Sequence, residues 1–314
     1  MKRLLFIYNP HAGKELLKAK LSDVIDIFVK AGYSVTVHPT QAYRDGYKVV
    51  KSYKSEDYDL VVCSGGDGTI DEIVTGMMQR DIDERDVIGY IPTGTTNDFA
   101  NSLHIPKNLL GAADVAVNGT PFSCDVGKFN HDIFVYIAAF GLFTDVSYQT
   151  KQEVKNVLGH LAYILEGTKR IFNVPSYKLK VTHDEEVIED EFIYGMVTNS
   201  KSVGGFKHII GKNVAFDDGV FEVTLIKTPK NPIELQEIVG ALLIEQIDTK
   251  HMYNFRSGFI KIESDEELPW TLDGEFGGAH YEVEIENLKQ QLCIMVPEEN
   301  AAGLLEDKNN ISGE

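Results

Sequence analysis

The sequence predicts a two-domain protein, in which an α/β domain built on a parallel sheet is followed by an antiparallel, β-rich domain. Its 314 residues are about twice the usual length of a single domain. Up to about residue 120, short continuous apolar runs alternate with segments of helical periodicity, which is typical of a parallel sheet covered on both faces. Beyond that point the runs alternate apolar with polar residues or follow one another in pairs, as antiparallel strands do.

The first domain, residues 1–120, is predicted to alternate strands with helices. Its strands are the apolar runs at residues 3–8, 33–38, 59–64 and 87–91. A first helix is predicted from Leu16 to Phe28, because apolar residues recur there at helical spacing up to Gly32. A polar helix through the forties and another from about Thr69 complete the alternation.

The second domain, residues 121–297, is predicted to consist mainly of strands. Their runs lie at residues 122–129, 132–140, 177–183, 186–199, 219–227, 258–264, 280–287 and 291–296. Two helices interrupt them, at roughly 152–173 and 232–247. Whether the last strands return to the first domain is left open. Residues 298–314 form an acidic tail.

The charge balance and the cysteines narrow the class of protein. With 30 Lys and Arg against 48 Asp and Glu, the formal net charge is −18, which argues against a nucleic-acid partner. The three cysteines, Cys63, Cys124 and Cys293, are too scattered for a disulfide framework or a zinc site, so a reducing cytoplasm is expected. We recognise neither a signal peptide nor an apolar stretch of transmembrane length.

A first motif, Asn9-Pro10-His11-Ala12-Gly13, directly follows the first strand and precedes a helix. Small residues and a glycine allow backbone amides to approach a phosphate, and a helix N-terminus adds its positive end. The motif therefore predicts a phosphate contact. A simple strand-to-helix turn is the alternative for this motif taken alone.

A second motif, SGGDGT at residues 64–69, follows the third strand. Three glycines within four positions remove the Cβ atoms that would block a phosphate chain, and Asp67 places a carboxylate where Mg²⁺ can join protein to phosphate. The spacing is neither that of a Rossmann fingerprint nor that of a P-loop, so the motif predicts a nucleotide site of another type. An ordinary turn aspartate is the alternative for Asp67.

Two further motifs carry carboxylates. PTGTTNDFA at residues 92–100 follows the fourth strand, where Thr95 offers a hydroxyl and Asp98 can cap a helix or hold a metal-bound water. In LDGEFGG at residues 272–278, Asp273 and Glu275 flank one glycine, a pattern that suits general-base catalysis on an alcohol and also occurs in surface turns. Because ligands of open α/β sheets bind at the carboxyl ends of strands, the first three motifs are predicted to share one site.

Taken together, NPHAG, GGDGT, PTGTTNDFA and LDGE, in this order, resemble the soluble bacterial diacylglycerol kinase and lipid kinase family, which is related to the sphingosine, ceramide and NAD kinases. The resemblance spans nearly the whole chain. It implies an N-terminal nucleotide-binding domain, a C-terminal β-sandwich domain, and ATP- and Mg²⁺-dependent phosphorylation of a lipid hydroxyl. Diacylglycerol, converted to phosphatidic acid, is the expected acceptor. An NAD kinase, which shares GGDGT, and a non-catalytic nucleotide-binding regulator are the alternatives.

The resemblance also assigns residues to the site. Those implied to line ATP are Asn9, Pro10, His11, Ala12, Gly13, Thr40, Gly66, Asp67, Gly68, Thr69, Ile70, Asp71, Glu72 and Thr95. Glu275 is implied to accept the proton of the lipid hydroxyl. The carboxylates implied to organise Mg²⁺ and water are those of Asp67, Asp98, Asp125 and Asp273. Family members often carry asparagine at the position of Asp71, so this chain adds a negative charge beside the phosphates.

A structural Mg²⁺ is implied on the segment that contains DDG. The side chain of Asp218 and the backbone carbonyls of Ala215 and Val220 are the expected ligands, and a plain β-turn is the alternative.

A lipid substrate requires contact with a membrane surface. Between residues 151 and 180 there are six basic and two acidic residues, with apolar residues at helical spacing, which predicts a basic amphipathic helix at the lipid interface. Packing of that helix on the β-rich domain is the alternative. The expected location is cytoplasmic and peripheral to the membrane, and exposed strand edges permit a homodimer.

Overall fold

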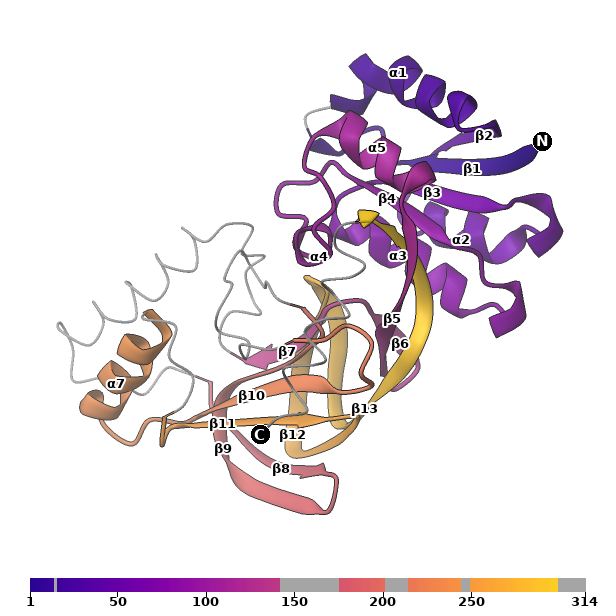
Figure 1. Ribbon diagram of the computed structural model, residues 1–314. Helices are drawn as coiled ribbons and strands as arrows, with labels where there is room; N and C mark the ends of the chain where they lie inside the picture. Colours follow the sequence, from indigo (N-terminus) through magenta and orange to yellow (C-terminus); the bar gives the residue numbers. More distant parts are fainter. Residues whose placement is uncertain (14–15, 142–174, 201–213, 244–248, 299–314) are drawn as a thin grey trace. The chain divides into compact units, whose positions relative to one another are not determined.

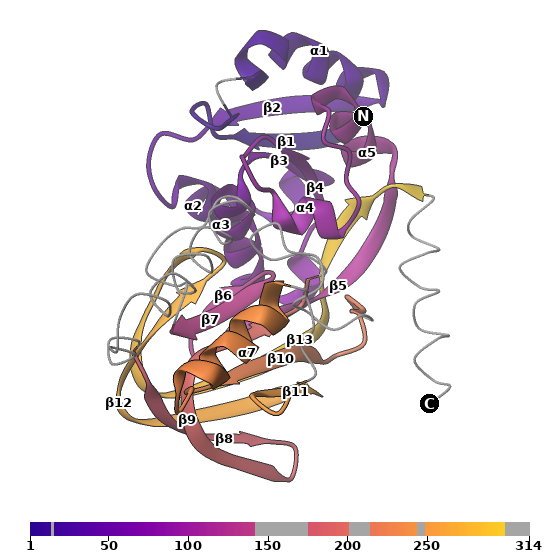
Figure 2. The same cartoon turned by 90° about the vertical axis from the view of Figure 1, so that its left-hand side faces the viewer.

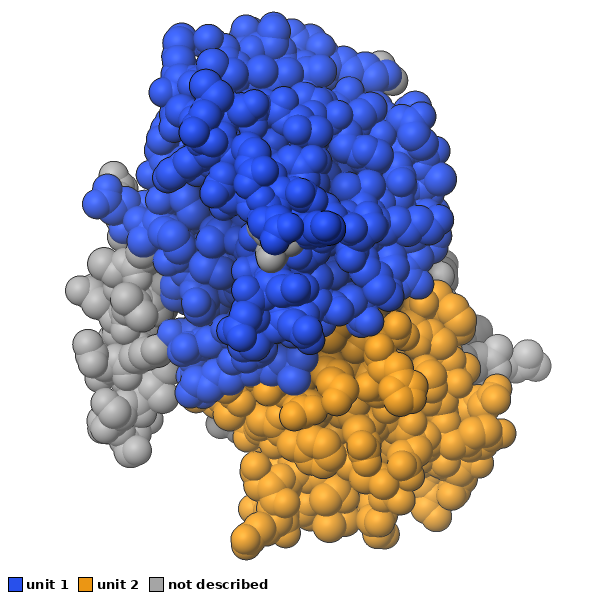
Figure 3. All heavy atoms as spheres, turned by 90° about the vertical axis from the view of Figure 1, so that its right-hand side faces the viewer, with its two compact units in different colours: residues 1–126, 215–218, 288–314 blue, residues 127–214, 219–287 orange. Residues whose placement is uncertain are grey.

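The computed structural model describes residues 1–13, 16–141, 175–200, 214–243 and 249–298. By its internal contacts the chain forms two compact units (Figure 3): unit 1 is Met1–Val126, Ala215–Asp218 and Leu288–Glu314, and unit 2 is Gly127–Val214 and Gly219–Asn287. The chain passes from unit 1 to unit 2 within β5 (Thr120–Phe129), returns to unit 1 for the short segment Ala215–Asp218, and returns a second time within β13 (Glu275–Val296). The helix expected at 152–173 and residues 299–314 of the tail lie outside the described residues.

Unit 1 contains the predicted parallel sheet, in the strand order β13-β4-β3-β1-β2. The strands that alternate with helices are β1 Lys2–Tyr8, β2 Tyr33–Pro39, β3 Leu60–Gly65 and β4 Ile88–Pro92. β1 pairs in parallel with both β2 and β3, and β3 pairs in parallel with β4. β13 joins the other side of β4, where Ile294 is opposite Ile88. The prediction of a parallel sheet in this half of the chain is confirmed.

Helices cover both faces of this sheet, which is why β3 and β4 are buried along their whole length. The helices are α1 Leu16–Lys30, α2 Asp45–Ser52, α3 Asp67–Met78, α4 Asp98–Ser102 and α5 Leu109–Asn118. α1 packs with α5 on one face, and α2 packs with α3 on the other (Figures 1 and 2). Right-handed crossovers require this arrangement, because β2 and β3 lie on opposite sides of β1. α4 and α5 were not predicted from the sequence.

Unit 2 is antiparallel throughout its described strand pairs, as predicted. Besides parts of β5 and β13, its strands are β6 Asp132–Phe134, β7 Ile137–Gly141, β8 Tyr177–His183, β9 Glu186–Thr198, β10 Phe221–Lys227, β11 Met252–Ser257 and β12 Phe259–Leu272. β7 and β8 each pair with both β9 and β12, at opposite ends of these long strands. α7 (Pro232–Leu243) occupies most of the helix predicted at 232–247.

Three strand predictions in this half were wrong in detail. The run predicted at 132–140 is divided into β6 and β7, because the backbone amides of residues 135–137 bond to a side chain from elsewhere. The strands predicted at 280–287 and 291–296 are one strand, β13. β11 was missed, since MYNFRS offers only a weak alternation of apolar and polar residues.

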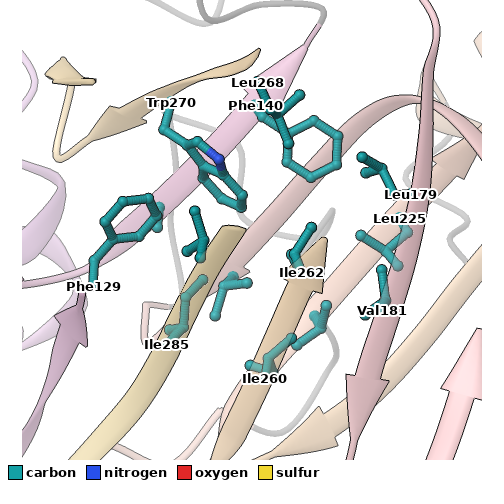
Figure 4. Packing of buried hydrophobic residues seen from close by; sticks show 14 of the residues in the cluster. Phe129, Phe140, Leu179, Val181, Leu225, Ile260, Ile262, Leu268, Trp270 and Ile285 are labelled. Carbon is teal, nitrogen blue, oxygen red and sulfur yellow. The ribbon is translucent and has the colours of Figure 1, made fainter. Parts of the chain in front are cut away.

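The core of unit 2 contains three aromatic rings in contact with one another (Figure 4). The ring of Trp270 lies 5.0 Å from that of Phe129 and 4.9 Å from that of Phe140, both edge to face. Phe140 also faces Gly195, its partner across β7 and β9. A Cβ atom on Gly195 would lie 2.2 Å from the Phe140 ring, so glycine is required for this packing.

Among the described helices, none is both long and apolar enough to span a bilayer.

We expect Gly195→Ala to lower the free energy of unfolding by about 1–3 kcal/mol, because the added methyl group must displace the Phe140 ring within a packed core. Gly240→Ala is the matched control: the position lies inside α7, and no atom of the described residues lies within 4 Å of a Cβ added there, so the same methyl group should stabilise by about 0.4–1 kcal/mol. Urea denaturation of both variants measures the two changes in the free energy of unfolding. Shifts of the same sign would contradict the packing account.

Candidate functional site

Three loops meet at the carboxyl edge of the unit 1 sheet, following β1, β3 and β4. The backbone N–H of Asn9 donates to the carbonyl of Ser64 at 2.9 Å, and that of Thr93 donates to the carbonyl of Gly65 at 2.8 Å. The amide of Thr40, at the end of β2, donates to the carbonyl of Tyr8. The structure thus brings together the first three predicted motifs and Thr40.

Glycines allow these loops to touch backbone to backbone. A Cβ on Gly94 would lie 2.5 Å from Cα of Gly66, so the loops after β3 and β4 are in direct contact. Gly13 has a φ of +56°, and a Cβ there would lie 1.8 Å from the carbonyl oxygen of Thr93. The surface made by these loops is therefore mainly peptide backbone, which suits contact with a phosphate.

Asp67 is the first residue of α3, and its carboxylate is in an unfavourable environment. Its Oδ1 atom is buried and has no hydrogen-bond partner among the described residues. The pKa of Asp67 is raised from 3.8 to about 6, mainly by burial and further by the charge of Asp98, although the backbone amides of Asp98, Phe99 and Asn97 lower it. A buried oxygen of this kind, next to a second carboxylate, is a fitting ligand for a cation.

The loop after β4 is shaped by its asparagines. Asn97 adopts a left-handed conformation (φ +52°), and its side-chain amide bonds both the N–H and the carbonyl of Gly94, at 2.9 and 2.8 Å. Asn101 donates to the carbonyl of Thr96 at 2.8 Å. These bonds hold the loop so that Thr95 is exposed and Asp98 is buried.

Glu72, expected to line ATP, is engaged with protein backbone. Its Oε1 accepts from the N–H of Arg44 at 2.6 Å, and its Oε2 accepts from the N–H of Gly46 at 3.1 Å. Both groups lie at the N-terminus of α2, which has no side-chain cap of its own. The structure thus gives Glu72 a partner that the sequence analysis did not foresee, and Asp71 remains half-buried beside it.

Asp125, on β5, is almost fully buried and lies in unit 1. Its Oδ1 accepts from the N–H of Gln290 at 2.8 Å, and its own N–H donates to the carbonyl of Phe216 at 2.6 Å. The side chain of Gln290 in turn donates to the carbonyl of Asp217. Asp125 therefore joins β5 to β13 and to the segment Ala215–Asp218, and a role in a metal network remains a prediction.

Asp273 and Glu275 lie on the hairpin between β12 and β13 of unit 2. Asp273 and Gly274 form its two-residue turn, with φ values of +49° and +89°, and Leu272 is opposite Glu275. The Asp273 carboxylate accepts from three consecutive backbone amides, those of Val135, Tyr136 and Ile137. Glu275 is exposed to solvent.

The described side chains around Asp218 do not form a recognisable site for the implied structural Mg²⁺. Asp218 is half-buried, and Ala215, which comes three residues earlier in the sequence, is buried. Among the described residues, no group of three or more His, Cys, Asp or Glu side chains is arranged to hold a metal ion. A site built from one carboxylate and the carbonyls of Ala215 and Val220 stays a prediction.

Comparisons with known proteins identify both halves of the chain. Residues 3–129 match the diacylglycerol kinase catalytic domain, and residues 139–295 match the YegS C-terminal NAD kinase beta sandwich-like domain. A diacylglycerol kinase of Bacillus subtilis (strain 168) is 33% identical over 305 residues, covering 97% of this chain and 99% of the relative. One from Staphylococcus carnosus (strain TM300) is 33% identical over 299 residues, covering 95% and 96%.

Solved structures of other proteins have the same fold as this chain. A crystal structure from Bacillus anthracis strain Sterne, described provisionally as a diacylglycerol kinase, superposes with a TM-score of 0.78 at 27% identity, covering 94% of this chain and 95% of the other. An NAD kinase from Archaeoglobus fulgidus in complex with ATP gives a TM-score of 0.54 at 13% identity, covering 99% and 100%, and so shares the fold.

The raised pKa of Asp67 predicts a pH-dependent effect of Asp67→Asn on stability. Between about pH 4 and pH 6 the native state binds this proton more tightly than the unfolded chain does, so the contribution of Asp67 to stability falls as the pH rises through that window. At pH 8, where native Asp67 is charged, the uncharged variant should be more stable by roughly 1–3 kcal/mol.

Urea denaturation at pH 8 and pH 5 measures this difference, which should shrink at pH 5. Asp83→Asn, at an exposed position, is the matched control and should show little change at either pH. An advantage of Asp67→Asn that is equal at both pH values would show that the charge is not responsible.

Proposed function

We propose that this chain, which belongs to the diacylglycerol kinase family and is a lipid kinase, transfers the γ-phosphoryl group of ATP to the hydroxyl group of diacylglycerol, giving phosphatidic acid and ADP. The observation that carries the proposal is the buried, unpartnered oxygen of Asp67 among three backbone-lined loops. The choice of acceptor is supported by the relatives named diacylglycerol kinases, which align over nearly the full chain.

The nucleotide phosphates are proposed to lie on the loops after β1, β3 and β4. α3 begins at Asp67 without a side-chain cap, and its helix dipole favours an anion there. The proposed contacts are Asn9 to Gly13, Thr40, Gly66 to Thr69, and Thr95. Glycines at the contact points of these loops allow the phosphates to approach the backbone closely.

Asp67 and Asp98 are the proposed Mg²⁺ ligands in unit 1, directly or through water. Mg²⁺ in kinases is commonly held by one or two carboxylates together with water and substrate phosphates, so a larger cluster of acidic side chains is not needed. When bound, the ion supplies positive charge against the phosphates. It would also relieve the repulsion between these two carboxylates, which raises the pKa of Asp67.

Glu275 is proposed to be the general base. Its carboxylate takes the proton of the lipid hydroxyl as that oxygen bonds to the γ-phosphorus and the bond from phosphorus to the β–γ bridging oxygen breaks, releasing ADP. Asp273 serves this step by fixing the hairpin turn that carries Glu275, since its carboxylate holds three backbone amides. Contact with the bilayer surface is proposed for the basic segment at 151–180.

Transfer of radiolabel from [γ-³²P]ATP tests the function directly. With Mg²⁺ present, we expect labelled phosphatidic acid from diacylglycerol in mixed micelles and no labelled NADP from NAD. Label on NAD alone would identify an NAD kinase. ATP binding without any transfer to diacylglycerol, sphingosine or NAD would identify a nucleotide-binding regulator.

Glu275→Gln should lower kcat for lipid phosphorylation by about 10²–10⁴-fold, because the amide cannot accept the hydroxyl proton. ATP affinity should be unchanged, since the base acts on the acceptor. Glu267→Gln, at an exposed position on the partner strand β12, is the matched control and should keep wild-type kcat. Steady-state kinetics with calorimetric ATP titration separates the two effects, and a Glu275→Gln enzyme with normal kcat would remove Glu275 from the mechanism.

A further inference from the structure

The segment 40–46, which runs from the end of β2 into the first two residues of α2, has an unusual backbone at Arg44. Arg44, the N-cap residue of α2, adopts a left-handed conformation with φ 59° and ψ 21°, which is uncommon for a residue other than glycine. Its own side chain does not cap the helix, and the guanidinium lies over the ring of Tyr47, 4.6 Å from its centroid. Other groups must therefore hold this turn in place.

Two carboxylates form hydrogen bonds that hold it. Asp45 accepts from the N–H of Gln41 at 2.8 Å and contacts Nε2 of His38 at 3.1 Å. Glu72 accepts from the N–H of Arg44 at 2.6 Å and from that of Gly46 at 3.1 Å. The Glu72 bonds engage both carboxylate oxygens and lie on either side of Asp45. They also place a negative charge at the N-terminus of α2, where the helix dipole favours it.

Glu72 belongs to the same helix as Asp67, slightly more than one turn further along α3. It therefore links two parts of the proposed nucleotide site, the start of α3 and the segment 40–46 that begins with Thr40. A carboxylate with both oxygens bonded to protein backbone is fixed in orientation and has fewer lone pairs left for a nucleotide.

We propose that Glu72 is a positioning residue, which acts on ATP through the segment 40–46 and does not contact the nucleotide itself. The inference rests on the proposed function in that ATP is the ligand. In Glu72→Gln the amide nitrogen is a donor facing a backbone donor, so one of the two bonds is lost and the left-handed turn at Arg44 is released.

We expect Glu72→Gln to raise KM for ATP about tenfold while kcat at saturating ATP stays within about twofold of wild type, because one charge-assisted hydrogen bond is lost and the reacting groups are untouched. Glu84→Gln, at an exposed position in the same unit, is the matched control. An unchanged KM, or a kcat that falls as strongly as kcat/KM, would overturn the inference.

A second substitution separates positioning from direct contact. Glycine adopts φ values near +59° without strain, so Arg44→Gly relieves the turn that Glu72 holds. If Glu72 acts through this turn, Glu72→Gln should raise KM for ATP by much less in an Arg44→Gly background than in the wild-type background. An equal increase in both backgrounds would indicate direct contact with ATP and overturn the inference.

Hydrogen exchange of the nucleotide-free protein supplies a readout that does not depend on activity. Glu72→Gln should reduce the protection of the amides of Arg44 and Gly46, and Glu84→Gln should not. Unchanged protection would overturn the inference even if catalysis were affected. A wild-type protein that fails to bind ATP would instead contradict the proposed function, so the two failures are distinguishable.

Discussion

One oxygen of the Asp67 carboxylate, buried and without a hydrogen-bond partner among the described residues, is the constraint on which the proposed site of unit 1 depends. Asp67 is the first residue of α3, which begins just after the end of β3, and burial raises the pKa of its carboxyl group to about 6. Glycines bring the three loops around it into close backbone contact. The native protein therefore keeps an unfavourable charge, and such local instability is characteristic of functional sites, where a ligand relieves it.

The carboxylates of the predicted site differ in what their environments allow them to do. Asp273 and Glu72 are bonded to consecutive or neighbouring backbone amides, and Asp125 bonds the backbone of β13. These three hold strands, a turn and a helix end in place. Asp67 retains an unsatisfied oxygen and Glu275 is exposed, so these two are free for chemistry. The hydrogen bonds of each carboxylate therefore decide whether it stabilises the backbone or is available for the reaction.

Much of the fold and of the candidate site could be predicted from the sequence. Continuous apolar runs fixed the parallel strands, and the glycine-rich motifs located the loops at their carboxyl ends. The short α4 was missed because its periodicity is too brief to detect, and Gln290 was missed because nothing local distinguishes it as the partner of Asp125. The bonds of Glu72 to residues 44 and 46 depend on how α2 packs against α3, which spacing along one chain does not reveal.

The titration of the Asp67 carboxyl group, followed by ¹³C NMR and assigned by comparison with Asp67→Asn, tests the central claim most directly. The account predicts a pKa of about 6 in the free protein. It also predicts a clear fall when Mg²⁺ and ATP are added together, because a bound cation stabilises the charged form. A pKa close to 4 in the free protein, or one that Mg²⁺ and ATP leave unchanged, would contradict it.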